Sequence, residues 1–245
     1  MPTSYTALRD SEKPQAQVIS FDADGTLWDF EKAMRASLAH TLIELQRIMP
    51  QTAPVTATLT VDRLIAIRDE VAEEMYGRGS TMEDIRLAAF VRALESVGYP
   101  DSEMAQHLTA FYLDRRFGDI APYPDVIPAL DQLRDRYRLG LVSNGNTYPE
   151  RCGLAGRFAF TVFAQDHGAR KPSSAFYEAV LQEAAVTADV FIHIGDSLTN
   201  DIAGAQAVGM RTVWLNRDRR KNTGAIQPDA EITSLHDLLP ILDTL

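Results

Sequence analysis

An acidic loop directly after a short apolar run is the feature that most constrains how this chain can fold. Val18, Ile19 and Phe21 are β-branched or aromatic, and the run ends abruptly in Asp22-Ala23-Asp24-Gly25-Thr26. This pattern is typical of a buried strand that feeds a loop. A loop at a strand end can turn two carboxylates inward, although the same residues also suit an ordinary polar turn.

Four later apolar runs repeat the strand pattern. They lie at Leu139 to Val142, Thr161 to Phe163, Val190 to Ile194 and Thr212 to Leu215. Helical periodicity fills most of the intervals, and strands that alternate with helices predict a mainly parallel sheet. We therefore expect an α/β fold whose core is a Rossmann-like parallel sheet flanked by helices.

The stretch from residue 28 to residue 119 differs, because its periodicity is helical throughout. Apolar residues recur there in steps of three or four, first at Met34, Leu38, Leu42, Leu45 and Met49 and then at Leu64, Ile67, Val71 and Met75. A third helix is expected to open with a capping box at Ser80 and Glu83, and a fourth to be capped by Ser102. The pattern predicts an all-helical, four-helix domain inserted after the first strand.

These patterns divide the chain into three parts. We expect a flexible tail over residues 1–15, an α/β core over 16–27 and 120–245, and the helical domain over 28–119. The first residues are polar and contain Pro2 and Pro14, without the continuous apolar stretch of a signal peptide or a membrane span. We expect a cytoplasmic protein that does not insert into a membrane.

Composition limits the classes of partner. The 245 residues are 45% hydrophobic, which is enough to bury a sizeable core. The formal net charge of -10 gives no electrostatic footprint for nucleic acid or for an anionic membrane. The single cysteine, Cys152, cannot form an internal disulfide or a thiolate zinc site. A small, freely diffusing partner is favoured, and both a monomer and a homodimer are compatible with the sequence.

Polar side chains follow the next two strands as well. Ser143, Asn144 and Gly145 come directly after one of them, and a hydroxyl with successive backbone N–H groups suits phosphoryl oxygens. Lys171 follows the other and precedes Pro172 and a helix, so its ammonium group can be aimed at an anion. Alone, the first fragment is an ordinary turn and the lysine is solvent-facing.

A fourth polar segment follows the strand Val190 to Ile194. It reads Gly195-Asp196-Ser197-Leu198-Thr199-Asn200-Asp201 and opens a helix. Asp196 is placed as a metal ligand and Asp201 as a ligand through water, although either could instead cap the helix.

Loops at the carboxyl ends of parallel strands meet at one edge of a sheet. Several carboxylates gathered there face strong repulsion, since like charges about 4 Å apart repel by roughly 4 kcal/mol at an effective dielectric constant near 20. Lys171 supplies one positive charge, and an oxygen-only set of ligands favours Mg²⁺, which prefers carboxylates, water and phosphate. The sequence predicts a magnesium site beside a phosphate.

The four segments FDADGT, VSNGN, RKP and IGDSLTND, in this order, resemble the four motifs of the haloacid dehalogenase superfamily. The resemblance spans nearly the whole chain, and the helical insertion is similar to the helical cap of its phosphatase branch. It implies a magnesium-dependent phosphatase of small phosphorylated metabolites.

The resemblance also implies residue roles. Asp22 would form an aspartyl-phosphate, Asp24 would act as general acid and then base, and Ser143 and Lys171 would hold the phosphoryl group, with Asn144 and Gly145 beside them. The metal ligands would be Asp22, the backbone carbonyl of Asp24, Asp196 and, through its water shell, Asp201.

Three alternatives share this core. In a 2-haloacid dehalogenase Asp22 would attack carbon and no metal would be needed, but such enzymes lack an acid at the position of Asp24. A phosphosugar mutase would return the phosphoryl group to a sugar. An inactive relative would only bind phosphometabolites.

Residues of the helical insertion are harder to assign. Trp28 is expected to pack at the junction with the core or to act as a hinge. Tyr76, Arg78 and Arg86 flank a turn between two helices and could contact the substrate, although a solvated helix face is the expectation for each arginine. For His193, in a strand, ordinary packing is expected.

Overall fold

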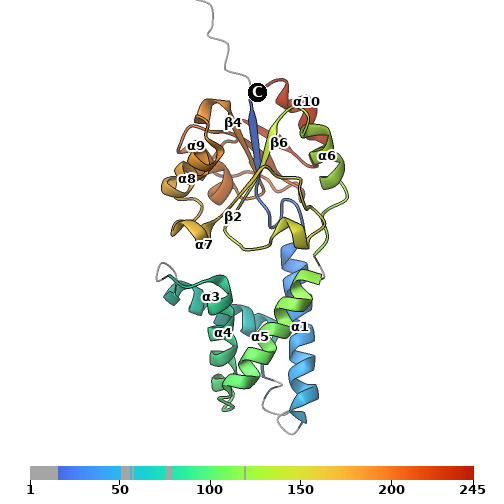
Figure 1. Cartoon of the computed structure of the whole chain (residues 1–245), viewed down its shortest axis with the longest axis vertical. Coiled ribbons are helices and arrows are strands. Elements are labelled where there is room, and N and C mark those ends of the chain that lie inside the picture. The colour runs from blue at the N-terminus through green and yellow to red at the C-terminus, as the bar shows by residue number, and fades with distance from the viewer. Residues whose placement is uncertain (1–15, 51–55, 57, 76–78, 119) are drawn as a thin grey trace, which may run out of the picture.

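Parallel strands form the centre of the upper part of the molecule in Figure 1. The computed structural model describes residues 16–50, 56, 58–75, 79–118 and 120–245. Within these ranges one six-stranded sheet has the order β3-β2-β1-β4-β5-β6, with every pairing parallel. The strands are β1 (Val18–Phe21), β2 (Arg138–Ser143), β3 (Phe160–Phe163), β4 (Phe191–Gly195), β5 (Arg211–Leu215) and β6 (Ala230–Ile232). The predicted α/β fold with a parallel sheet is confirmed, and β6 is an additional edge strand.

Strand β1 lies between β2 and β4, so the loops that follow these three strands open side by side. The four residues of β1 are fully buried, which explains why they read as an uninterrupted apolar run apart from Ser20. The first acidic loop therefore starts from the middle of the sheet, between the loops that carry Ser143 and Asp196.

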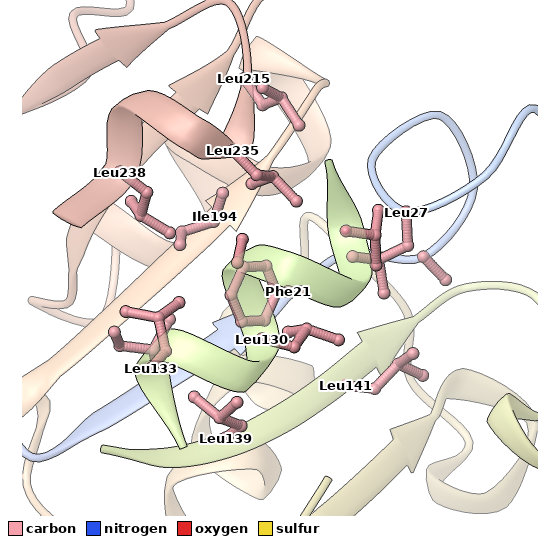
Figure 2. Close-up of a cluster of buried hydrophobic side chains, with 14 of the residues drawn as sticks. Phe21, Leu27, Leu130, Leu133, Leu139, Leu141, Ile194, Leu215, Leu235 and Leu238 are labelled. Atoms are coloured by element: carbon pink, nitrogen blue, oxygen red, sulfur yellow. The ribbon is translucent and has the colours of Figure 1, made fainter. Parts of the chain in front are cut away.

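One face of the sheet packs against α6 (Val126–Leu133) and α10 (Leu238–Leu242). Figure 2 shows Phe21 of β1 beside Leu130 of α6, within a cluster that Leu235 and Leu238 also join. Burial of each such side chain contributes roughly 1.5–3 kcal/mol, so this layer holds the central strand in place.

The other face packs against α8 (Ser174–Ala184) and α9 (Gly204–Gln206), with Phe176 and Tyr177 fully buried (Figure 1). A π-helix, η4 (Leu198–Ala203), precedes α9. The remaining short elements are α7 (Ala164–His167) and the 3₁₀ turns η2 (Pro149–Arg151), η3 (Ala188–Val190) and η5 (Leu235–Asp237).

Four helices, counted in the described part of the insertion, form a bundle at one end of the sheet (Figure 1). They are α1 (Phe30–Ile48), α3 (Val61–Met75), α4 (Met82–Ser96) and α5 (Ser102–Gly118), and we call them the helical bundle. Their buried side chains form a cluster separate from those on the sheet. The division into a core and a cap domain at residues 28 and 119 stays a prediction. None of the helices in the described ranges is long and apolar enough to cross a bilayer.

Two predicted helix caps are shifted by one residue. The capping box of α4 joins Thr81 and Asp84, not Ser80 and Glu83, because the side chain of Thr81 accepts from the Asp84 N–H and Asp84 accepts from the Thr81 N–H. In α5, Asp101 and not Ser102 accepts from the N–H of Met104, at 2.9 Å. At the start of α5 a carboxylate thus takes the capping position in place of a hydroxyl, which N-cap preferences allow.

The two connections between the sheet and the bundle run side by side. The N–H of Tyr123 donates to the carbonyl of Leu27 at 2.9 Å, and Trp28 forms a β-bridge with Pro122. Close by, Asp125 is buried and accepts two hydrogen bonds from Arg217, at 2.8 and 3.1 Å. Backbone hydrogen bonds between the two connections and the ion pair of Asp125 with Arg217 therefore hold this junction together.

Candidate active site

Three carboxylates converge where the central strands end. Asp22 follows β1, Asp196 follows β4, and Asp201 comes from the π-helix η4. One carboxylate oxygen of each lies within 4.8 Å of the others. Asp22 and Asp201 are buried, whereas about a third of the Asp196 side chain is exposed. The predicted convergence of strand-end acids is therefore present, with one of them open to solvent.

Lys171 lies between two of these carboxylates. Its ammonium group donates to Asp22, to Asp201 at 2.7 Å and to the carbonyl of Val142 at 3.0 Å. The side chain is 2% exposed, so all three donor positions are filled inside the protein. Burial would lower the pKa of Lys171, but Asp201 and Asp22 more than offset this and hold it above its ordinary value. The lysine is a permanent cation of the site.

One cation does not balance three carboxylates. Burial raises the pKa of Asp22 well above its ordinary value, and Asp201 and Asp196 add to this while Lys171 opposes it. Burial likewise raises the pKa of Asp196 to about 6, with repulsion from Asp201 as the next cause. Burial would also raise the pKa of Asp201, but Lys171 and His193 hold it below its ordinary value. Uncompensated negative charge thus collects on Asp22 and Asp196.

Asp24 faces the same space from the other side of the loop. Its Oδ1 accepts a hydrogen bond of 2.7 Å from the indole Nε1 of Trp28, which is fully buried. Burial raises the pKa of Asp24, although Trp28 and Arg116 oppose the shift. Trp28 packs at the junction as predicted, and it also fixes the orientation of this carboxyl group, which the sequence did not indicate.

Gly25 allows the acidic loop to approach Asp196. It has φ +90°, and a Cβ atom there would lie 2.9 Å from Oδ2 of Asp196. The left-handed backbone and the close approach both favour glycine. This loop can therefore pass directly beside the exposed carboxylate.

The end of β2 and the loop after it contribute Ser143, Asn144 and Gly145 to the site. Ser143 is buried, and its hydroxyl accepts from the N–H of Gly145 at 3.0 Å. The side chain of Asn144 is used elsewhere, because it exchanges two hydrogen bonds with the backbone of Lys171, at 2.8 and 3.1 Å. Asn144 therefore positions the lysine. A cavity of about 150 Å³ brings together all eight residues predicted for the site: Asp22, Asp24, Ser143, Asn144, Gly145, Lys171, Asp196 and Asp201.

His193 contacts the carboxylate of Asp201. Its Nε2 lies 3.3 Å from Asp201 Oδ1, its Nδ1 lies 2.7 Å from the hydroxyl of Ser20, and its ring meets the edge of Tyr177. Burial lowers the pKa of His193, which favours the neutral ring. Packing was the expectation for this residue, and the contact with Asp201 is additional.

Two arginines of the helical bundle reach the loop after β2. Nη2 of Arg86 donates to Asn146 Oδ1 at 2.9 Å, and Nη2 of Arg116 donates to Thr147 Oγ1 at 2.7 Å. The expectation that Arg86 lies on a solvated face is wrong, since it is 6% exposed. Sequence reasoning missed Arg116, which is fully buried. Tyr76 and Arg78 lie outside the described residues.

The helix periodicity contains a signal for the burial of these arginines. Arg116 follows Leu108 and Tyr112 in four-residue steps, so it continues the buried stripe of α5. Arg86 is similarly spaced from Phe90 in α4. A charged residue inside an apolar stripe marks a side chain that needs a buried partner.

The stretch of chain that contains the site resembles known proteins. A family model described as haloacid dehalogenase-like hydrolase matches residues 16–209, the stretch that holds every residue of the cavity. The chain belongs to this family. The site described above is therefore that of a haloacid dehalogenase-like hydrolase, in which a helical bundle lies beside the sheet (Figure 1).

Relatives match over nearly the full length. The glyceraldehyde 3-phosphate phosphatase of Methanopyrus kandleri is 28% identical over 240 residues, which cover 94% of this chain and 98% of that protein. The putative HAD-hydrolase YfnB of Bacillus subtilis is 30% identical, covering 93% and 95%. The structure of a 2-haloacid dehalogenase from Pseudomonas syringae pv. Tomato DC3000 has a TM-score of 0.77 and 33% identity, covering 94% and 99%. The family includes relatives named for two different chemistries.

Proposed function

We propose that this hydrolase is a magnesium-dependent phosphatase that cleaves a small phosphomonoester through an aspartyl-phosphate on Asp22. The observation that carries the proposal is that Asp22 and Asp24 face one cavity, with Lys171 held beside the first and the indole of Trp28 beside the second. A nucleophile next to a cation and an acid held by a donor are what transfer of a phosphoryl group to a carboxylate needs.

The reaction would proceed in two displacements. A carboxylate oxygen of Asp22 attacks phosphorus, the ester P–O bond breaks, and Asp24 gives its proton to the departing alkoxide. Asp24, now ionised, takes a proton from water, whose oxygen displaces the carboxylate of Asp22 and releases inorganic phosphate. The sum is ester plus water giving alcohol plus phosphate. The raised pKa of Asp24 supports its role as the acid of the first step.

The residues present fit a magnesium ion. The clustered donors are all carboxylate oxygens, and the raised pKa values of Asp22 and Asp196 indicate that negative charge there lacks a counter-ion. We propose Asp22, Asp196 and the backbone carbonyl of Asp24 as ligands, with Asp201 behind them. When bound, the ion would neutralise phosphate charge. Asp201 already accepts from Lys171 and from the N–H of Ser197, which suits a supporting position.

Replacement of the nucleophile tests the proposal. Asp22→Asn removes the attacking carboxylate with almost no change in volume, so phosphate release from 4-nitrophenyl phosphate should fall by about a factor of 1,000 or more. Asp29→Asn is the matched control, since Asp29 is an exposed N-cap of α1. Near-normal turnover by Asp22→Asn would contradict the assignment of the nucleophile.

Metal removal tests the second part. The wild-type protein should lose activity after treatment with a chelator and regain it with added magnesium. Activity that persists without a divalent ion would contradict the cofactor and leave the nucleophile untouched.

Dehalogenation is the second candidate, because a relative named for it is 33% identical. A halide leaving group needs no proton, so the oriented carboxyl group of Asp24 favours the phosphatase. Incubation with 2-chloropropanoate and measurement of free chloride distinguish the two. Chloride release at a rate above phosphate release would reverse our proposal.

A further inference from the structure

A second cavity opens from the catalytic one into the helical bundle. Its volume is about 210 Å³, and Asp24, Asn144 and Gly145 line its end at the sheet. Most of the other lining side chains are apolar and belong to the bundle: Phe30, Met34, Leu38, Leu64, Ile65, Met82, Ala89, Phe90 and Tyr112. A leaving group that takes its proton from Asp24 therefore faces an apolar space.

Arg86 and Arg116 are two of the three arginines that line this cavity, and the third, Arg68, pairs with Asp69 at 2.8 Å. Their hydrogen bonds to Asn146 and Thr147 place both guanidinium groups next to the loop that carries Gly145. Both arginines also line the cavity that Asp24 lines. An anion that binds them would be close to the bond that is cleaved.

The Arg116 guanidinium has few partners among the described residues, although Asp24 is close enough to interact with its charge. Its Nε and Nη1 have no hydrogen-bond partner, it forms no ion pair within 4.0 Å among the described side chains, and its guanidinium lies 4.8 Å from the ring of Phe30 and 4.9 Å from that of Phe117. Arg86 has one distant partner, Glu83, at 3.6 Å. Burial, with repulsion from Arg116, lowers the pKa of Arg86 to about 10. Two buried like charges facing an apolar cavity are a site that lacks its anion.

We propose that the leaving group is a hydroxycarboxylic acid with an apolar body, whose carboxylate binds Arg116 and Arg86 while the body enters the bundle. This proposal rests on the proposed phosphatase and adds the class of its substrate. A carboxylate matches a guanidinium that keeps N–H groups without partners, here at Nε and Nη1 of Arg116. Because the arginines lie beside Asp24, the carboxylate belongs on or next to the carbon that bears the ester oxygen. Arg68, the third arginine of the lining, is engaged by Asp69, which leaves Arg86 and Arg116 for the carboxylate.

A pair of esters that differ in one group tests this. O-phospho-3-phenyllactate carries the carboxylate, and 1-phenylpropan-2-yl phosphate has a methyl group in its place. We expect kcat/KM for the first to exceed that for the second by about 100-fold, because a buried site built to hydrogen-bond a group rejects the analogue that lacks it. In Arg116→Met the ratio should fall below about 5-fold, and Arg116→Lys should give an intermediate value because it keeps the charge without the planar fork.

Arg115→Met is the matched control. Arg115 is the adjacent residue of α5, it is exposed, and its guanidinium lies 5.5 Å from the ring of Phe111. The same change of charge at this position should leave the 100-fold ratio in place. Arg86→Met provides a second variant if Arg116→Met does not fold, and it should also lower the ratio.

Four outcomes decide the matter. A high ratio that Arg116→Met or Arg86→Met lowers supports the proposal. Equal turnover of both esters overturns it while the phosphatase stands, and so does a high ratio that survives in both variants. If neither ester releases phosphate, the proposed phosphatase fails instead, and calorimetric titration with 3-phenyllactate then decides. Binding that weakens at least 10-fold in Arg116→Met supports the carboxylate site, and absence of binding to the wild type overturns it.

Discussion

Removal of the charge of Lys171 should make the stability of this protein depend strongly on pH. The substitution Lys171→Met keeps most of the side-chain volume but leaves Asp22 and Asp201 facing each other, both buried, without their common cation. Breaking a buried ion pair by removing one partner costs roughly 3–5 kcal/mol. For a chain of this size the melting temperature should fall by about 10 °C at pH 8.

The loss should disappear in acid. Without Lys171 the pKa values of Asp22 and Asp201 in the folded state rise above the unfolded value of about 3.9, since only repulsion and burial remain. A raised pKa means that the folded state becomes less stable as the pH rises through the unfolded value toward the folded one. Wild type and variant should therefore differ little near pH 4 and most at pH 8.

Thermal unfolding followed by circular dichroism from pH 4 to pH 8 measures this difference. A second substitution, Asp22→Asn in the Lys171→Met background, should restore several degrees at pH 8, because it removes one of the two repelling charges. Added magnesium should stabilise Lys171→Met more than the wild type if the carboxylates bind it. A Lys171→Met protein that melts with the wild type at pH 8 would refute the electrostatic reasoning.

Three further predictions concern other parts of the molecule. Gly145→Ala should lower kcat on an alkyl phosphate by about 10- to 100-fold, because the new Cβ would lie 2.8 Å from Oδ2 of Asp24 and displace the acid; unchanged kcat would contradict this. Asp125→Asn should reduce the free energy of unfolding by about 2–3 kcal/mol at pH 7 by weakening its bonds to Arg217. Burial would raise the pKa of Asp125 but Arg217 and its other donors hold it low, so this difference should vanish as the pH falls below about 4 in urea titrations. Burial raises the pKa of Cys152 to about 11, so iodoacetamide at pH 8 should label it slowly in the folded protein and quickly in urea.

The site could be located from the sequence because each of its loops follows a recognisable strand. The apolar runs before Asp22, Ser143 and Asp196 predict parallel strands, and parallel strands deliver their carboxyl ends to one edge. That argument needs only the direction and order of the strands. The short strand β6 (Ala230–Ile232) escaped because three residues carry too little periodicity.

The cavity in the helical bundle could not be predicted in the same way. Burial of Arg86 depends on contact between α4 and the loop after β2, 60 residues away in sequence, and local helix periodicity does not report such contacts. The partner of Asn144 is likewise set by the approach of Lys171, 27 residues later. The roles of such residues can be assigned only from a structure, because they depend on contacts with distant parts of the chain.

The pairing of the two connections has a consequence for how such enzymes diversify. The helical bundle leaves the sheet after Leu27 and returns at Tyr123, and these two residues are hydrogen-bonded neighbours. A segment whose ends already touch can lengthen, shorten or be exchanged between relatives without moving the strands that hold the reactive groups. The helical bundle can therefore change in evolution while the reactive groups at the strand ends stay in place.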